Sequence, residues 1–253
     1  MTQTPASPSR TGVFAELVDI ARTVTIGLAA ALALHATLFQ PFTIPSSSME
    51  PGLVTGDYIV VSKFAYGWSL ASPSISIPLA AGRLFGRDPK RGDVVVFRLP
   101  RDPRQVWIKR VIGLPGDRVA VRDGVVFVNN RPFATVVQAP IPDPSTPQRI
   151  VVPVRESQPG GPTYTIHDGG PGLPGDEMAT VVVPAGHYFV MGDNRDNSLD
   201  SRWPGDVGVG FLPAENLMGR AEVVVASWHP GAGLLRPWTW LNLRPGRLWK
   251  PIN

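Results

Sequence analysis

The chain has 253 residues, a formal net charge of +4 and no cysteine. Its length allows one sizeable domain with an anchor, or two small domains. Without cysteine, disulfides, thiol catalysis and cysteine-based metal sites are excluded, and the four scattered histidines lack the spacing of a metal motif. We therefore expect no metal and no cofactor. The 28 prolines and 26 glycines predict many turns and short strands rather than long helices.

A long uncharged segment near the N-terminus predicts a membrane anchor. Residues 23–40 (TVTIGLAAALALHATLFQ) carry no charged side chain. As a helix rising about 1.5 Å per residue they would span about 27 Å, close to the hydrocarbon thickness of a bilayer. We predict a transmembrane helix over these residues, preceded by a tail and anchor flank over residues 1–22. A cleaved signal peptide is the alternative, but Leu34 and Ala36 would make a poor cleavage site.

The charges around this segment predict its orientation. Arg10 and Arg22 precede it, whereas residues 40–61 contain no lysine or arginine. The positive-inside rule therefore predicts a single-pass protein with a cytoplasmic N-terminus. It places the rest of the chain on the outer side of the cytoplasmic membrane.

Three consecutive serines follow the predicted anchor in the stretch PSSSMEP. Pro51 would stop a helix, and Pro45 favours an extended residue before it, so we expect an extended turn that presents a hydroxyl. A polar stop after a membrane helix is the alternative. Seven residues separate Gln40 from Ser48. At no more than about 3.6 Å per residue, they keep Ser48 within roughly 30 Å of the membrane surface.

Beyond the serines, the pattern is typical of short β-strands. Runs rich in β-branched residues and bounded by turn residues predict strands at 58–62, 93–97, 105–112 and 188–191. Asp123-Gly124 between two apolar runs predicts a hairpin. Residues 131–184 are dense in proline, glycine and serine, which is typical of an inserted, loosely built subdomain. The sequence therefore predicts a mainly β fold.

Lys109 is the one lysine inside an apolar strand. Strand alternation places it on one face with Trp107 and Val111, and places Ile108 on the other face. Burial among such neighbours would lower the pKa of Lys109 from about 10.4 towards neutrality, and a neutral amine can act as a general base. A snorkelling or salt-bridged lysine is the alternative.

Other serine chemistries lack their motifs in this chain. Neither a GxSxG elbow nor a Ser-x-x-Lys motif occurs. His167, His187 and His229 lie in no motif that suggests a Ser-His-Asp triad. A hydroxyl paired with a lysine remains, and Lys109 is the good candidate for that lysine.

The net charge is concentrated at the C-terminal end. Residues 229–253 hold four cationic side chains and no acidic one, with three tryptophans among them. Such a Trp/Arg-rich tail suits the surface of a bilayer that contains anionic lipid. Nucleic acid could use a similar patch, and a tail folded onto the domain is an equal alternative.

Four blocks of the sequence resemble those of bacterial type I signal peptidases (leader peptidases), in the family's order and behind a segment like the family's anchor. They are PSSSMEPGLVTGDYIVVSKFAYG (45–67), RGDVVVF (91–97), WIKRVIGLPGD (107–117) and GDNRDNSLDSR (192–202). The resemblance implies a signal-peptidase-like complex β fold of packed antiparallel sheets after the transmembrane helix. The implied parts are a catalytic β-domain over residues 41–117 and 188–228, an inserted cap subdomain over 118–187, and a C-terminal tail over 229–253.

The resemblance also implies an activity. It is that of a membrane-bound serine endopeptidase that removes N-terminal signal peptides from exported preproteins, cutting after small residues of the Ala-x-Ala type. Ser48 matches the family's nucleophile, and Lys109 matches the general base of its Ser–Lys dyad. The supporting matches are Ser46, whose hydroxyl joins the Ser48 backbone N–H in an oxyanion hole, Ser198, which orients the lysine amine, and the charged pair Asp200 and Arg202. For Ser198 and the charged pair, a turn with ordinary side-chain-to-backbone bonds is the alternative.

Seven apolar residues match positions that line the family's two shallow pockets for small side chains before the cut. Core packing is a competing account of the same residues. They are Phe42, Ile44, Met49, Leu53, Val96, Trp107 and Ile108. Two features depart from the family: the turn WPGDV follows Arg202, and Trp107 stands where tyrosine is frequent, which would narrow the first pocket.

The resemblance implies signal-peptide-bearing preproteins, the lipid bilayer and a nearby secretion translocon as partners, and no nucleic acid. Four alternatives stay open. The self-cleaving repressors also use serine and lysine but are soluble. Organelle processing peptidases would need a transit peptide, which residues 1–12 support poorly. Eukaryotic secretory enzymes use histidine as the base, and a non-enzymatic β scaffold would retain a dead site.

Overall fold

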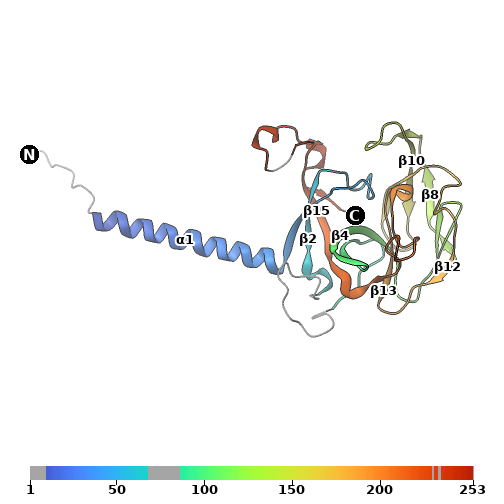
Figure 1. The fold of residues 1–253 in the computed structure, drawn as a ribbon, viewed down its shortest axis with the longest axis horizontal. Helices are drawn as coiled ribbons and strands as arrows, with labels where there is room; N and C mark the ends of the chain where they lie inside the picture. Colours follow the sequence, from blue (N-terminus) through green and yellow to red (C-terminus); the bar gives the residue numbers. More distant parts are fainter. Residues whose placement is uncertain (1–9, 68–85, 230, 233–234, 253) are drawn as a thin grey trace, which may run out of the picture.

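The structure is a computed structural model that describes residues 10–67, 86–229, 231–232 and 235–252 (Figure 1). One helix, α1 (Arg10–Thr37), precedes a body built of β-strands. Short 3-10 helices connect the strands at Lys63–Tyr66, Arg195–Asn197, Ala214–Asn216, Pro237–Thr239 and Pro245–Arg247. The expected mainly β fold is therefore confirmed.

The largest sheet of the described residues has eight strands in the order β1-β2-β15-β3-β4-β13-β14, with β16 pairing β15 as well. All its neighbours pair antiparallel. The bounds are β1 (Phe39–Thr43), β2 (Asp57–Ser62), β3 (Val94–Leu99), β4 (Asp102–Gly113), β13 (His187–Met191), β14 (Leu212–Pro213), β15 (Leu217–Ser227) and β16 (Lys250–Pro251). The strands predicted at 58–62, 93–97, 105–112 and 188–191 correspond to β2, β3, β4 and β13.

Two smaller sheets take up the strands between residues 118 and 182. One contains β5 (Arg118–Arg122), β6 (Val125–Val128), β7 (Arg131–Pro132) and β12 (Met178–Val182). The other contains β8 (Ala134–Val137), β9 (Ile141–Pro142), β10 (Ile150–Ser157) and β11 (Thr163–Asp168). The predicted hairpin is the antiparallel pair β5–β6, whose turn residues Asp123 and Gly124 both have positive φ. The division into a catalytic domain and a cap at 117 and 188 stays a prediction, although strand pairing separates the same segments.

Strand β4 lies where the sheets pack, so its two faces contact different parts of the core. Ile108 belongs to an apolar cluster with Ile44 and Met49. Trp107 and Val111 pack into a second cluster on the other side of the large sheet. The predicted alternation along this strand is confirmed, and it fixes where Lys109 emerges.

The predicted bounds of the N-terminal helix are wrong. The helix begins at Arg10 instead of residue 23, and it ends at Thr37 instead of residue 40. It ends early because Phe39–Thr43 is extended and pairs with β2. In the part of the chain that the structure describes, no helix has both the length and the apolar character needed to cross a bilayer.

The C-terminal tail folds back onto the body. Strand β16 pairs with β15, and Arg247 forms an ion pair with Asp57 at 2.5 Å. Arg244 Nη1 also donates to the carbonyl oxygen of Thr55 at 2.9 Å. The tail still exposes large apolar side chains, because Trp238 is 80% exposed and Leu241 is 99% exposed.

Candidate active site

A serine and a lysine that lie 61 residues apart in the sequence meet at the surface of the large sheet. Lys109 Nζ lies 2.8 Å from Ser48 Oγ. The lysine belongs to β4, and the serine belongs to the turn between β1 and β2. That turn is closed at its base by the bond from Ile44 N to Asp57 O at 2.8 Å, and inside by the bond from Leu53 N to Met49 O at 2.9 Å. The extended turn predicted from the prolines is therefore a closed loop that presents Ser48.

The Lys109 side chain is shielded from solvent. The residue is only 3% exposed, and its burial lowers the pKa of Lys109 to about 8, although the charges of Asp200 and Asp193 act in the opposite direction. The amine also donates to the carbonyl oxygen of Ile108 at 2.9 Å. At pH 7, roughly a tenth of an amine with this pKa is neutral, so this side chain can accept a proton.

Two further groups beside Ser48 can donate to an oxygen. Ser46 Oγ lies 3.4 Å from Ser48 Oγ, and the Ser46 residue is exposed. The backbone N–H of Ser48 donates to no acceptor among the residues that the structure describes. The Ser48 N–H can therefore donate to a substrate oxygen, and the exposed Ser46 hydroxyl can turn from Ser48 Oγ to the same oxygen, as an oxyanion hole requires.

The structure brings Ser198 to the site without the bond that the sequence predicts. Ser198 lines the same cavity as Ser48 and Lys109. Its buried hydroxyl makes no bond to the lysine amine. It lies instead close enough to Asp200 to help lower the pKa of that carboxyl group. The lysine is oriented instead by Ser48 Oγ and by the carbonyl oxygen of Ile108.

Asp200 and Arg202 form the buried charged pair that the sequence predicts. Arg202 donates from Nε and Nη2 to the two carboxylate oxygens, both at 2.9 Å. Burial raises the pKa of Asp200, but Arg202 and the backbone N–H of Gly192 outweigh it, so the pKa lies below the ordinary value. Arg202 also donates to the carbonyl oxygen of Arg195. The pair therefore fixes the loop that carries Ser198.

Two asparagines that the sequence analysis missed hold the serine loop in place. Asn194 donates its backbone N–H to Ser48 O at 3.1 Å and its Nδ2 to Ser47 O at 3.2 Å. Asn197 donates its Nδ2 to Ser47 Oγ at 2.7 Å. Their presence in the block GDNRDNSLDSR was a signal, but only the fold shows that they face the serines.

The structure brings together some of the predicted pocket residues and separates others. Phe42 packs against an apolar cluster that contains Ile44, Met49, Leu53, Val96 and Ile108. Of the seven predicted residues, only Trp107 and Ile108 line the cavity of about 490 Å³ that also contains Ser48 and Lys109. Core packing therefore accounts for most of the others. The cavity has a second wall, made by residues 196–199 and Trp203.

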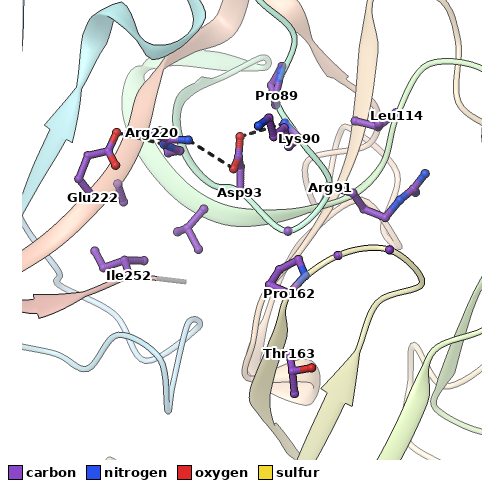
Figure 2. Close-up of a pocket in the computed structure, with 15 residues that line it drawn as sticks. Pro89, Lys90, Arg91, Asp93, Leu114, Pro162, Thr163, Arg220, Glu222 and Ile252 are labelled. Atoms are coloured by element: carbon purple, nitrogen blue, oxygen red, sulfur yellow. Dashed lines mark hydrogen bonds and ion pairs between the residues drawn. The ribbon is translucent and has the colours of Figure 1, made fainter.

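A cavity of about 750 Å³ lies elsewhere, between the turn that precedes β3 and the β10–β11 turn. Figure 2 shows that Arg220 approaches Asp93 and Glu222 in this cavity. No serine lines it. Size therefore does not identify the site, whereas the serine beside a buried amine does. Among the described residues, no three His, Asp or Glu side chains lie close enough together to hold a metal ion.

A serine hydroxyl in contact with a buried lysine defines a class of candidates, the serine peptidases that use lysine in place of histidine. The family model described as "Signal peptidase, peptidase S26" matches residues 17–228. The chain belongs to this signal peptidase family and is a serine endopeptidase.

Two relatives compared by sequence agree with this assignment. The chain is 35% identical to a signal peptidase I of Rickettsia typhi over 90% of this chain and 91% of that protein. It is 36% identical to one of Rickettsia canadensis over 82% and 83% of the two chains. Among solved structures, a signal peptidase I from Enterococcus faecalis is 29% identical and covers 53% of this chain and 97% of that one, with a TM-score of 0.31.

Proposed function

We propose that this enzyme cleaves N-terminal signal peptides from exported preproteins, with Ser48 as the nucleophile and Lys109 as the general base. The observation that carries the proposal is the distance of 2.8 Å between Lys109 Nζ and Ser48 Oγ. The burial that lowers the pKa of Lys109 to about 8 supports it, because it leaves a usable neutral fraction of the amine near neutral pH.

The first half of the reaction forms an ester between enzyme and substrate. Ser48 Oγ attacks the carbonyl carbon of the scissile peptide bond, and its proton passes to Lys109 Nζ. The developing oxyanion accepts hydrogen bonds from Ser46 Oγ and the Ser48 backbone N–H. The ammonium of Lys109 then returns the proton to the leaving nitrogen, the C–N bond breaks, and the mature protein departs with a new N-terminal amine.

The second half releases the signal peptide. Lys109 takes a proton from a water molecule as that water attacks the ester carbonyl. The tetrahedral intermediate collapses, and the proton passes from Lys109 to Ser48 Oγ as the C–O bond breaks. The signal peptide leaves as a carboxylic acid, which loses its proton to the solvent, and the dyad returns to its starting state.

The preference for small residues before the cut follows from space. Beside Ser48, the cavity is lined by Ile108, which belongs to the same apolar cluster as Ile44, Met49 and Leu53, and these three are packed at 1–3% exposure. A methyl group fits against such a filled wall, whereas a larger side chain would have to displace core residues. We therefore propose cleavage of the Ala-x-Ala type.

The test of the dyad compares wild type with Ser48→Ala, Lys109→Ala and Lys109→Arg on a purified preprotein. All three variants should lose cleavage by at least about 1,000-fold, because removal of a nucleophile or its base leaves only binding and oxyanion effects. Arginine keeps length and charge but cannot give up its proton near neutral pH. Cleavage by Lys109→Arg at the wild-type rate would remove Lys109 from the role of base.

We further propose that the enzyme works at the outer side of the cytoplasmic membrane, near the translocon, with α1 and the tail in contact with lipid. Helix α1 carries exposed apolar side chains along its length, including Phe14, Ile20, Val24 and Leu32. Figure 1 shows the tail, in dark red, on the same side of the β-body as α1. Exposed Trp238 and Leu241 among arginines suit an anionic lipid surface.

Vesicle binding tests the tail's part in this proposal. The full chain with Trp238→Gln and Leu241→Gln should bind vesicles of anionic lipid more weakly than the wild type, and binding of both should fall with salt. Val136→Gln is the matched control, because Val136 is an exposed apolar residue of β8 outside the tail. Equal binding of the tail variant and the wild type would rule out lipid contact by the tail.

A further inference from the structure

Part of the catalytic cavity consists of apolar side chains that the proposed chemistry does not use. The cavity is lined by Pro45, Ser46 and Ser48, by residues 106–109, and by residues 196–199 with Trp203, which form the second wall. Leu199 and Trp203 are the large apolar residues of the second wall. Trp203 opens the turn WPGDV, which distinguishes this chain from the familiar family pattern.

Hydrogen bonds hold this second wall rigidly. Trp203 Nε1 donates to the carbonyl oxygen of Ser198 at 3.1 Å, and the carbonyl oxygen of Trp203 accepts from Gly210 N at 3.1 Å. Arg101, from the β3–β4 turn, donates to the carbonyl oxygens of Asp206 at 2.9 Å and Gly208 at 3.3 Å. The turn after Arg202 is therefore fixed to the same hairpin that carries Lys109.

The wall presents apolar surface to the cavity. Leu199 is 46% exposed although it lines the cavity. The indole of Trp203 uses its one polar hydrogen on Ser198 O, so the rest of the ring offers only apolar atoms. Trp107 lines the same cavity, and the centroid of its ring lies 5.4 Å from Lys109 Nζ. A nonpolar side chain would bury itself between these groups.

The proposed reaction indicates which segment of the substrate lies beside the second wall. The acyl part must bring its carbonyl oxygen to the Ser46 and Ser48 donors. The leaving nitrogen must come within hydrogen-bond reach of Lys109 Nζ to receive its proton. The segment that follows the scissile bond therefore starts beside Lys109, in the cavity that Leu199 and Trp203 also line.

We infer that Leu199 and Trp203 form a subsite for a nonpolar side chain at the first or second position after the scissile bond. This inference rests on the proposed roles of Ser48 and Lys109. It assigns to the turn after Arg202 a part in substrate selection. The enzyme would thus read the start of the mature protein as well as the end of the signal peptide.

Matched peptides test the subsite. All carry alanine at the first and third positions before the cut, and they differ in having Leu, Ala or Asp at the first or second position after it. Wild type should prefer Leu to Asp by about tenfold or more in kcat/KM, as expected for one apolar side chain in a pocket. Leu199→Ser should reduce this preference to about twofold or less while the preference for alanine before the cut persists. Val207→Ser is the matched control and should keep the wild-type preference, because Val207 is exposed on the same turn but does not line the cavity.

Three outcomes would overturn the subsite. In the first, the wild type cleaves the peptides with Leu, Ala and Asp after the cut with equal kcat/KM. In the second, Leu199→Ser lowers kcat/KM equally for all peptides. In the third, Leu199→Ser changes the preference for alanine before the cut. Binding of uncleaved peptides to Ser48→Ala keeps the subsite testable even if Ser48 is not the nucleophile. In that variant the Leu peptide should bind more tightly than the Asp peptide, and Leu199→Ser should abolish the difference. Failure of the dyad would appear separately, as cleavage that survives in Ser48→Ala.

Discussion

The carbonyl oxygen of Ser48 lies 2.5 Å from the position that a β-carbon on Gly192 would occupy. Ser198 Oγ lies 2.3 Å from the same position. Glycine is therefore needed at residue 192, directly after β13, because any side chain would push apart the serine loop and the loop that carries Ser198.

The first prediction concerns this contact. Gly192→Ala should lower kcat/KM by about 100-fold or more, because displacing reacting groups by about 1 Å is enough for such a loss. Kinetics and the thermal midpoint should be measured together. Gly246→Ala is the control, since nothing lies within 4 Å of its β-carbon position. A fully active Gly192→Ala would contradict the close packing described here.

The second prediction concerns pH. Burial lowers the pKa of Lys109 to about 8, so the base is mostly protonated below that pH. The value of kcat/KM should therefore rise about tenfold per pH unit below pH 8 and level off above it. The measurement is cleavage of a peptide across pH 6 to pH 10, with the folded fraction checked at each pH. A profile that is flat across pH 8 would be inconsistent with an amine base in this environment.

The third prediction concerns Asp200, whose charge raises the pKa of Lys109. Asp200→Asn removes that charge and leaves Arg202 buried without its partner, so the pKa of Lys109 should fall further. The midpoint of the pH profile should move below 8, while the free energy of unfolding falls by roughly 3–5 kcal/mol.

Asp57→Asn provides the control for this shift. Asp57 is buried and paired with Arg247 far from the lysine, so its loss should lower stability without moving the midpoint. An unchanged midpoint in Asp200→Asn would show that this carboxylate does not tune the base.

The fourth prediction concerns the bond between Asn194 and the serine loop. Asn194→Asp turns a donor that faces Ser47 O at 3.2 Å into an acceptor, and the two oxygens repel. We expect kcat to fall by about tenfold or more with a smaller change in KM, because the loop shifts while the binding surface remains. Asn216→Asp makes the same change at a remote bond, in which Asn216 Nδ2 donates to Arg98 O. It should lower the free energy of unfolding and leave kcat unchanged. Equal kcat losses in the two variants would point to general destabilisation.

Much of the fold could be predicted because local pattern controls it. β-Branched runs between turn residues marked β2, β3, β4 and β13, and Asp123-Gly124 marked a hairpin whose turn requires positive φ. The bounds of α1 could not be predicted from hydropathy. Its end depends on the pairing of Phe39–Thr43 with β2, which is a contact between segments rather than a property of either one.

The candidate site, like the fold, could be predicted only in part. The resemblance to the family singled out Ser48, Lys109, Asp200 and Arg202, and the structure places all four around one cavity and its supporting loop. The predicted bond from Ser198 to the lysine is absent, and the amine donates to the carbonyl oxygen of Ile108. Residues expected to line pockets mostly fill the core, since a strand pattern shows which face is apolar but does not show whether that face is left open.

By itself, the sequence determined the chemistry that is available: a presented hydroxyl, a lysine among apolar neighbours, no thiol, and the order of the four blocks. Only the tertiary structure decided that the hydroxyl and the amine meet, how dry the amine is, and which wall of the cavity remains free for a substrate. The reason is physical. A proton transfer and a pKa depend on distances and on solvent exclusion, and both are set by sheet pairings and loop contacts between residues that lie far apart in the chain.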